Sequence, residues 1–305
     1  MFVSQERPAQ WNPTRRQVFR HQTVPVRARK AWETLTWPAS VLFLLVLNGR
    51  IHPGYGLTVR DKVRLGYRLW RTTRHVTTGT SYKAHMAMAA ALLRLPPKAK
   101  GVVVECGCFQ GGSTANLSII CDVVGRDLIV YDSFEGLPEP TPGDKYAKPE
   151  GTGLFHGPID VVKANVETYG VIERCTFRKG WFADTLPHHT EPVVLAFLDV
   201  DYPASLHDCI QHLWPRLHDR GYVFIDEYVL TDYCALFWSE RYWRTYFDTT
   251  PPGLIGSGSG VGVGQYYLGP HHEGSFALAP TSVAYTRKDF SGYWDFYPEE
   301  HAGDR

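Results

Sequence analysis

Long apolar runs and paired cysteines are missing from this 305-residue sequence. The longest apolar run is ASVLFLLVL, residues 39–47, about half of the roughly 20 residues that span a bilayer. It also has no small-residue cleavage site after it, as a signal peptide would. We therefore expect no transmembrane segment, and a buried helix or strand at residues 39–47. The six cysteines contain no CxxC pair, which argues against a structural zinc site or a disulfide framework. We expect a reducing, cytoplasmic setting.

Acidic residues are scarce in the first quarter of the chain. Residues 1–75 hold 14 Lys/Arg against 3 Asp/Glu, a net charge of +11, whereas the remaining residues hold 18 against 28, a net charge of −10. A basic segment of this kind can bind a membrane surface, an anion or nucleic acid. It can equally pack against the acidic part of its own chain or of a second subunit. We expect such packing rather than nucleic acid binding, and it would allow a homodimer.

The basic segment contains one strong helical pattern, from Val59 to Arg74. A 3.6-residue period separates two groups of side chains on this helix. The apolar group is Val59, Val63, Tyr67 and Trp70, and the basic group is Arg60, Arg64, Arg68 and Arg71. We expect the apolar group to pack on the rest of the protein and the arginines to face solvent.

From residue 81 onward, short apolar segments alternate with longer helical ones, which is typical of an α/β domain with a largely parallel sheet. The expected strands are residues 101–106, 127–132, 175–180, 193–200 and 221–228. The expected helices are residues 81–95, a helix from Ser113, and residues 159–170, 205–217 and 241–247. The predicted parts are a basic N-terminal arm with a helical extension (1–80), the α/β domain (81–270) and an aromatic C-terminal tail packed on it (271–305).

A glycine-rich turn follows the first expected strand, in VVVECGCFQGGS, residues 102–113. Glycines let the backbone approach a ligand closely, and the start of the next helix offers free N–H groups. The spacing of Gly107, Gly111 and Gly112 is not the GxGxxG of a dinucleotide site, which disfavours a dehydrogenase. Asp132, at the end of the next strand, could accept both hydroxyls of a ribose. Glu105, the glycine turn and Asp132 together fit S-adenosylmethionine, although a tight turn without a ligand would also explain the glycines.

Carboxylates also follow the two later expected strands. Asp199 and Asp201 alternate with Val200 and so point to one side of their strand, and Asp226 and Glu227 end the next one. Four carboxylates at adjacent strand ends would repel one another unless a cation lay between them, and Mg²⁺ prefers oxygen ligands. We expect Asp199 and Asp226 to hold a metal. For Asp201, which precedes Pro203 and a helix, we expect helix capping or a salt bridge.

Five segments of the sequence resemble the macrocin O-methyltransferase family, whose members use S-adenosylmethionine to methylate sugar hydroxyls of antibiotic glycosides. The segments lie within residues 81–247, in the family's order and at similar spacing. They are VVECGCFQGGS, YDSFEGLPEP, RKGWFADTLP, LDVDYPASLHDCIQHLWPRL and RGYVFIDEY.

The resemblance implies a class I methyltransferase fold with a mostly parallel seven-stranded sheet flanked by helices. It assigns S-adenosylmethionine to Glu105, Gly107, Phe109, Gly111, Ser113, Asp132 and Ser133, with Trp181 and Phe182 near the adenine. It assigns a metal, expected to be Mg²⁺, to Asp199, Asp226 and Glu227. An Asp-Glu pair stands here where the family usually has two aspartates.

The expected reaction is an in-line transfer of the methyl group to an acceptor hydroxyl, with Asp199 as metal ligand or general base. Ahead of the first strand the sequence departs from the family's acceptor-binding residues, and there has Arg74, His75, Tyr82, Lys83 and His85. We therefore expect another small hydroxylated acceptor, a sugar or a sugar-bearing natural product. Candidate helpers are Tyr82 and His188, His189, His271 and His272.

Two other enzyme mechanisms are also compatible with these residues. The first is a metal-independent methyltransferase with Asp199 as the general base. The second is a metal-dependent hydrolase built on Asp199 and Asp226, which would have no need of Asp132. A non-enzymatic role in binding nucleic acid or membrane also remains open for the basic N-terminal segment.

Overall fold

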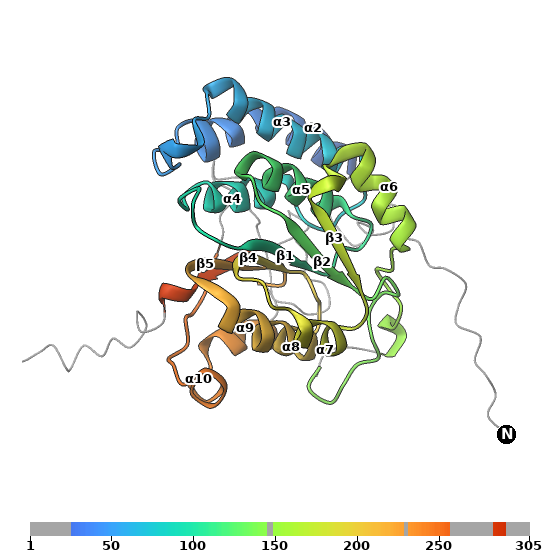
Figure 1. Ribbon diagram of the computed structural model, residues 1–305. Coiled ribbons are helices and arrows are strands. Elements are labelled where there is room, and N and C mark those ends of the chain that lie inside the picture. The colour runs from blue at the N-terminus through green and yellow to red at the C-terminus, as the bar shows by residue number, and fades with distance from the viewer. Residues whose placement is uncertain (1–25, 145–148, 229–230, 257–282, 291–305) are drawn as a thin grey trace, which may run out of the picture.

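The computed structural model describes residues 26–144, 149–228, 231–256 and 283–290, which form an α/β fold in three layers (Figure 1). The central sheet has seven strands in the order β3-β2-β1-β4-β5-β7-β6. Strands β1 to β5 are parallel, β7 runs antiparallel to β5, and β6 runs antiparallel to β7. The predicted fold class, a mostly parallel seven-stranded sheet flanked by helices, is confirmed.

The central strands are apolar on both faces because helices cover both sides of the sheet. Their bounds are β1 Val102–Cys106, β2 Leu128–Asp132, β3 Cys175–Lys179, β4 Val193–Leu198 and β5 Leu217–Ile225. β4 is buried along its whole length, whereas β3 at the edge is partly exposed. The sheet is completed by β6 Ile255–Gly256 and β7 Ala284–Arg287. β7 therefore comes from the stretch that the sequence analysis assigned to the C-terminal tail.

Two groups of helices enclose the sheet (Figure 1). One face is covered by α2 Val26–Val41, its π-helical continuation Leu42–Val46, α3 Val59–His75, α4 Tyr82–Leu92, α5 Gly112–Val124 and α6 Ile159–Tyr169. The other face carries α7 Phe182–Thr185, α8 Pro203–Leu213, α9 Thr231–Ala235 and α10 Glu240–Phe247. Short 3₁₀ turns include Ile172–Arg174, Leu186–His188 and Trp214–Arg216. No helix in the described part of the chain is both long and apolar enough to cross a membrane.

Helix α3 forms where it was predicted, but three of the four apolar side chains expected to pack inward are exposed, and only Trp70 packs against the core. Thr58 and Asp61 form a reciprocal capping box at its start. Val59, Val63 and Tyr67, expected to pack inward, are 61%, 40% and 43% exposed; the buried side chains are instead Leu65, Leu69, Thr72 and Thr73. The two threonines can be buried because each hydroxyl donates to a backbone carbonyl of the preceding turn.

The apolar run at residues 39–47 is helical, but only part of it is buried, so that prediction was only partly correct. Val41 and Leu45 are buried against the core, whereas Phe43 and Leu47 are 54% and 62% exposed. The outer side of α2 has no further helix of the described residues packed on it (Figure 1). An apolar run on an outermost helix therefore leaves one side in contact with solvent.

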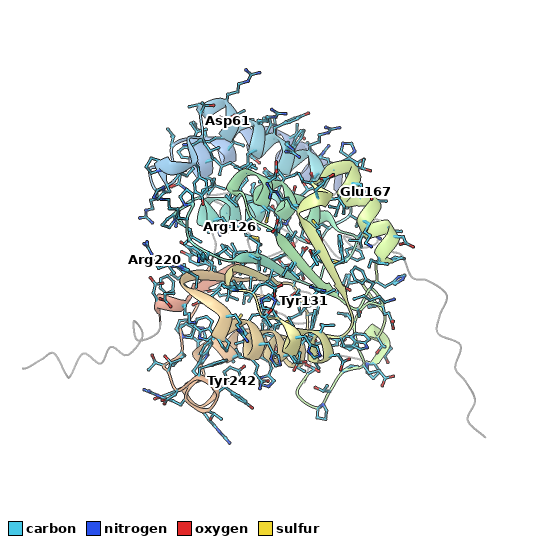
Figure 2. The ribbon with its side chains drawn as sticks, viewed as in Figure 1. Asp61, Arg126, Tyr131, Glu167, Arg220 and Tyr242 are labelled. Carbon is cyan, nitrogen blue, oxygen red and sulfur yellow. The ribbon has the colours of Figure 1, made fainter. Side chains whose placement is uncertain are left out.

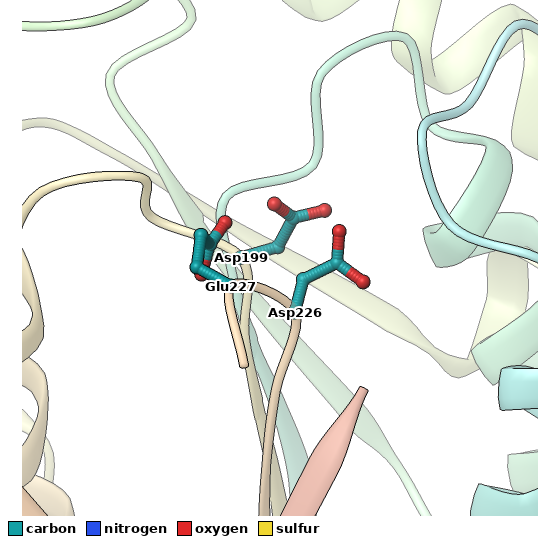
Figure 3. A group of neighbouring side chains, drawn as sticks. All are labelled: Asp199, Asp226 and Glu227. Carbon is teal, nitrogen blue, oxygen red and sulfur yellow. The ribbon is translucent and has the colours of Figure 1, made fainter. Parts of the chain in front are cut away.

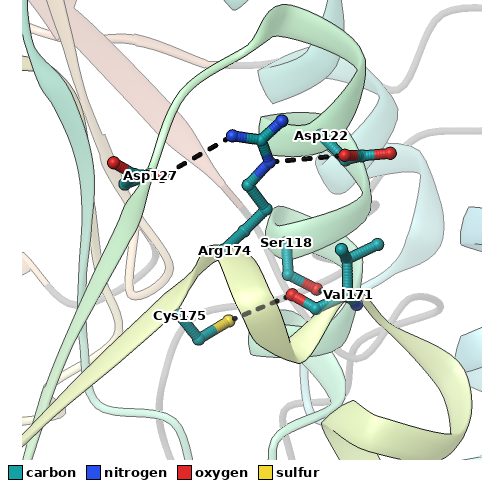
Figure 4. Close-up of polar contacts among 6 residues, drawn as sticks. All are labelled: Ser118, Asp122, Asp127, Val171, Arg174 and Cys175. Atoms are coloured by element: carbon teal, nitrogen blue, oxygen red, sulfur yellow. Dashed lines mark hydrogen bonds and ion pairs between the residues drawn. The ribbon is translucent and has the colours of Figure 1, made fainter.

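An ion pair at the sheet edge fixes the start of β3 (Figure 4). The Nε atom of Arg174 lies 3.3 Å from Oδ1 of Asp122 on α5, and its Nη1 lies 3.7 Å from Oδ1 of Asp127 before β2. All three side chains are partly exposed, so the contact contributes at most about 1 kcal/mol. Asp127 and Arg174 directly precede β2 and β3, so the contact lies at the amino ends of these strands and links them to α5.

Asp144, rather than Asp201, caps helix α8, which corrects the sequence prediction for Asp201. The N-cap residue Tyr202 has no capping side chain. Asp144, 60 positions earlier in the chain, accepts a hydrogen bond of 2.9 Å from the backbone N–H of Ala204. Its other oxygen accepts from the backbone and hydroxyl of Thr141. Asp201 has a left-handed backbone (φ +59°) and makes no ion pair with a described residue.

We expect Asp144→Ala to lower the free energy of unfolding by about 1–2 kcal/mol, because it removes a helix cap and the hydrogen bonds that Asp144 accepts from Thr141 and Ala204. Urea unfolding of the variant measures this loss. The matched control is Asp219→Ala, which removes an exposed aspartate and should change stability by less than about 0.5 kcal/mol. Equal effects of the two substitutions would mean that Asp144 does not stabilise α8.

Candidate functional site

The predicted polar residues meet at the carboxyl ends of four neighbouring strands. Glu105 is the penultimate residue of β1, and Asp132 is the last residue of β2. Asp199 directly follows β4, and Asp226 directly follows β5. The sheet order places β2, β1, β4 and β5 side by side, so these carboxylates share one edge. In open α/β sheets this edge is where ligands bind.

The glycine turn after β1 is built against the peptide of Asp199. Gly107 has φ +84°, and a Cβ atom there would lie 1.8 Å from the carbonyl oxygen of Asp199. The N–H of Asp199 donates to the carbonyl of Cys106 at 3.0 Å. Gly111 (φ +82°) begins α5 without any capping side chain, which leaves N–H groups at the helix start for a ligand. The turn therefore joins the first strand to the acidic residues after β4.

Asp132 organises the same turn from the end of β2. Its carboxylate accepts hydrogen bonds from the N–H of Cys108 at 2.7 Å and of Phe134 at 2.6 Å. Each oxygen keeps a second lone pair, so ribose hydroxyls could still bind. The N–H of Gly180 donates to the carbonyl of Asp132, which places Trp181 and Phe182, at the start of α7, beside this strand end. Trp181 is 39% exposed.

Glu105 is a buried carboxylate without a hydrogen-bond partner. Its exposure is 0%, and neither carboxylate oxygen has a partner among the described residues. Burial raises its pKa to about 8, although the nearby hydroxyls of Ser113 and Thr114 lower it. A buried carboxylate beside a glycine turn suits a ligand that carries positive charge. S-adenosylmethionine, with its ammonium and sulfonium groups, fits these residues.

Asp199, Asp226 and Glu227 form an acidic triad (Figure 3), in which one oxygen of each lies within 4.8 Å of the others. Thr80 donates to Oδ2 of Asp199 at 3.3 Å, a contact that no sequence pattern indicated. One oxygen each of Asp226 and Glu227 is buried without a partner, and no described residue forms an ion pair with the triad. Burial raises the pKa of Asp199 to about 6 and, with the charge of Asp199, raises the pKa values of Asp226 and Glu227. The donor set, three carboxylates without a counter-cation, fits Mg²⁺.

Stability should fall as pH rises from 6.5 to 8.5 when no ligand is present. Burial raises the pKa of Glu105 to about 8 and of Asp201 to about 7, whereas both groups are already ionised in the unfolded chain. The folded state therefore binds more protons, and its free energy of unfolding decreases with pH across this interval. The pKa of buried His85 is lowered from 6.5 to about 3, so its opposite contribution lies mostly between these two pH values and fades at the start of this interval. Urea unfolding at several pH values measures the slope, which Glu105→Gln should reduce; a flat or rising profile would contradict the assignment.

Several residues that the sequence analysis considered lie away from this edge or inside the core. Tyr82 and His85 of α4 are 1% and 0% exposed, and His85 Nδ1 is hydrogen-bonded to Asn116. His189 is buried and lies 2.9 Å from the hydroxyl of Tyr131, which Figure 2 labels. His75 stacks on Tyr169. His271 and His272 lie outside the described residues.

Phe109 and Ser133 both belong to the turns at the strand ends. Phe109 has a left-handed backbone (φ +46°) and packs edge-on against the ring of Phe155. The hydroxyl of Ser133 accepts from the N–H of Glu135 and donates to the carbonyl of Gly136. In the described residues both side chains therefore shape the loops around the glycine turn.

Comparison with known sequences shows which family the chain belongs to. The profile described as Macrocin-O-methyltransferase (TylF) matches residues 58–248. The 8-demethyl-8-(2,3-dimethoxy-alpha-L-rhamnosyl)-tetracenomycin-C 4'-O-methyltransferase of Streptomyces olivaceus is 33% identical over 178 residues, or 55% of this chain and 67% of that enzyme. The demethyldecarbamoylnovobiocin O-methyltransferase of Streptomyces niveus is 30% identical over 190 residues, or 58% of this chain and 71% of that enzyme.

Among solved structures, the O-methyltransferase NovP has a similar fold. Its TM-score is 0.52 at 20% sequence identity, and the match covers 84% of this chain and 99% of that chain. The fold and the site thus define a class I S-adenosylmethionine-dependent methyltransferase. The chain belongs to the macrocin O-methyltransferase (TylF) family. This family membership argues against the metal-dependent hydrolase and the dehydrogenase considered from the sequence.

Proposed function

We propose that this enzyme transfers a methyl group from S-adenosylmethionine to a hydroxyl of a sugar or of a glycosylated natural product, with Mg²⁺ held by the acidic triad. The observation that carries the proposal is the triad itself, which lies against the glycine turn through the contact between Gly107 and Asp199. Donor and acceptor would then meet at one strand edge. The names of two relatives, a tetracenomycin rhamnosyl methyltransferase and a novobiocin methyltransferase, support a natural-product acceptor.

The cofactor would be held by the residues around β1 and β2. A cationic group of the cofactor beside Glu105 would lower the pKa of its carboxyl and so draw a negative charge under the glycine turn. The α5 start at Gly111, Gly112 and Ser113 would supply N–H groups. Asp132 would accept the ribose hydroxyls while keeping its two backbone donors. Trp181 and Phe182 would pack against the adenine from the start of α7. These residues would hold the cofactor beside the strand edge that carries Asp199.

In the reaction a C–S bond of the sulfonium breaks and a C–O bond to the acceptor forms, and the acceptor hydroxyl loses its proton. Asp199 is the proposed proton acceptor and also a metal ligand, and Thr80 fixes one of its oxygens. Bound Mg²⁺ would lower the pKa of the acceptor hydroxyl. The proton lost by the acceptor hydroxyl would thus pass to Asp199, and no covalent enzyme intermediate is needed. Positioning the reactants is the main contribution of the remaining residues.

Direct Mg²⁺ binding tests the triad without reference to activity. Isothermal titration of Mg²⁺ into the apo enzyme should give one site, and Glu227→Gln should weaken it at least about tenfold because a charged oxygen ligand is lost. Glu227→Asp, which restores the aspartate pair usual in the family, should retain binding. Asp219→Asn, an exposed change of equal charge, is the control. Equal binding by wild type and Glu227→Gln would remove Glu227 from the metal site, and absence of Mg²⁺ binding by wild type would favour the metal-independent mechanism.

The methyl transfer itself is tested by mass spectrometry of acceptors incubated with enzyme and S-adenosylmethionine. The first acceptors to use are L-rhamnosides with and without an aromatic aglycone. Methylated product and one equivalent of S-adenosylhomocysteine are expected. If the enzyme binds Mg²⁺ but methylates no glycoside, the proposed acceptor is wrong while the proposed metal site stands.

A further inference from the structure

Exposed apolar residues concentrate on α2, on its π-helical continuation and on α3. Thirteen large apolar side chains are exposed in the described residues, and seven of them lie within residues 35–67: Leu35, Leu42, Phe43, Leu47, Val59, Val63 and Tyr67. The other six are spread over residues 161–255. Exposed apolar side chains gathered in one region mark a surface that contacts something other than water. We call these seven residues, with the exposed arginines of α3, the α2–α3 outer face.

Arginines are interleaved with these apolar residues on α3. Arg60, Arg64, Tyr67 and Arg71 follow one another at helical spacing, so they form one stripe, and all four are exposed. The opposite side of α3 packs on the core through Leu65 and Leu69. The stripe therefore points away from the domain. Figure 1 shows α2 and α3 as the outermost helices on their side of the sheet.

Aromatic contacts join the two helices. Trp37 of α2 stacks on Trp70 at 5.5 Å and meets Tyr67 edge-on at 5.7 Å. The guanidinium of Arg74 lies 5.7 Å from the ring centre of Trp70. These contacts join α2 to α3; of the three rings, Tyr67 is exposed, whereas Trp37 and Trp70 are partly buried and pack against the core. Trp and Tyr rings of this kind prefer the boundary between water and lipid.

The charge of this region is opposite to that of the rest of the chain. Residues 34–75 hold seven Lys/Arg and one acidic residue, whereas the residues after 75 carry a net charge of −10. An anionic surface would attract the α2–α3 outer face and repel most of the remainder, which fixes the orientation of the molecule. Basic residues near an anionic bilayer are attracted to it, and their aliphatic stems cover apolar surface.

We propose that the α2–α3 outer face docks on an anionic phospholipid bilayer, with α3 lying in the plane of the headgroups. The helix would insert its apolar side chains shallowly and would not span the bilayer. Two-fold pairing with a second copy fits less well, because it would bring the Arg60, Arg64 and Arg71 stripes together. Nucleic acid would use the arginines but not Leu35, Phe43 and Leu47. The proposal does not depend on the acceptor or the metal.

Vesicle co-sedimentation with the full-length protein tests this surface. The vesicles are phosphatidylcholine alone, or phosphatidylcholine with roughly one third phosphatidylglycerol. The basic variant is Arg60→Gln/Arg64→Gln/Arg71→Gln, and the apolar variant is Phe43→Ser/Leu47→Ser. The charge-matched control is Arg216→Gln/Arg220→Gln/Arg241→Gln, which removes three exposed arginines elsewhere; Figure 2 labels Arg220 well away from Asp61 of α3. The apolar control is Trp238→Ser/Tyr246→Ser.

We expect binding to the anionic vesicles that weakens at high salt, and a loss of roughly tenfold or more in the basic and apolar variants. Each control should stay within about twofold of wild type. Circular dichroism and S-adenosylmethionine binding show whether the variants are folded. Absence of vesicle binding by wild type, or equal losses in variants and controls, overturns the proposal. The proposal is also overturned if light scattering shows that wild type is an oligomer which the variants dissociate. It is equally overturned if the variants lose binding to duplex DNA but keep binding to vesicles.

Discussion

Replacing Asp199 by Asn should lower kcat by at least about a hundredfold while leaving S-adenosylmethionine affinity within about threefold of wild type. The substitution removes a charged oxygen from the triad and with it the proposed proton acceptor. Asn has nearly the same shape and can still accept the hydrogen bond from Thr80, so the fold of the loop should survive. Steady-state kinetics with a methylated acceptor, together with calorimetric titration of the cofactor, measure the two quantities separately.

The control for this prediction lies on the same strand pair. Asp219→Asn removes an exposed carboxylate at the opposite end of β5 and should change kcat by less than about twofold. If Asp199→Asn keeps more than about a third of the wild-type kcat, proton removal does not depend on this residue. Asp201, the neighbouring buried carboxylate, would then be the next group to replace.

Replacing Asp132 by Ala should abolish S-adenosylmethionine binding, with a loss of at least about a hundredfold in affinity. The carboxylate accepts from the N–H groups of Cys108 and Phe134, and each buried donor left without a partner costs about 1–3 kcal/mol. The same substitution also removes the proposed ribose acceptor. Titration calorimetry of S-adenosylmethionine into the wild type and the variant measures the change directly.

Thermal unfolding must accompany this measurement because Asp132 also orders the glycine turn. If the Ala variant does not fold, Asp132→Asn keeps the volume and one acceptor oxygen and can be titrated instead. Asp160→Ala, which alters an exposed residue at the start of α6, should bind the cofactor like wild type. Unchanged affinity in a folded Asp132 variant would remove this residue from the cofactor site.

The parallel sheet was predictable from sequence because each of its strands is a short apolar segment between helical ones. The bounds of β1, β2, β3 and β4 lie within one or two residues of the prediction. The same regularity placed Glu105, Asp132, Asp199 and Asp226 at strand ends. Since parallel strands end at one edge, their meeting followed from topology. The resemblance to a known family supplied the remaining residues, such as Trp181 and Ser133.

Contacts between segments distant in sequence could not be predicted in this way. The hydrogen bond from Ala204 to Asp144 spans 60 positions, and the one from Thr80 to Asp199 spans 119. Neither Thr80 nor Asp144 belongs to a recognisable pattern. The buried face of α3 was misassigned because the pattern was built on Val59, Val63 and Tyr67 and passed over Leu65 and Leu69, which are buried. Thr72 and Thr73, on the same buried face, satisfy their hydroxyls within the helix. Periodicity reports hydrophobicity, and it misses polar groups that are satisfied locally.

The contact between Gly107 and the carbonyl of Asp199 has a consequence for how such enzymes diversify. Two backbones touch there without an intervening side chain, so the spacing between the donor-binding turn and the acceptor-side carboxylate is set by main-chain geometry. Side-chain replacements elsewhere leave that spacing unchanged. In the proposed reaction, changes in the surrounding loops and helices would therefore admit other acceptors while the spacing between the glycine turn and Asp199 stays the same.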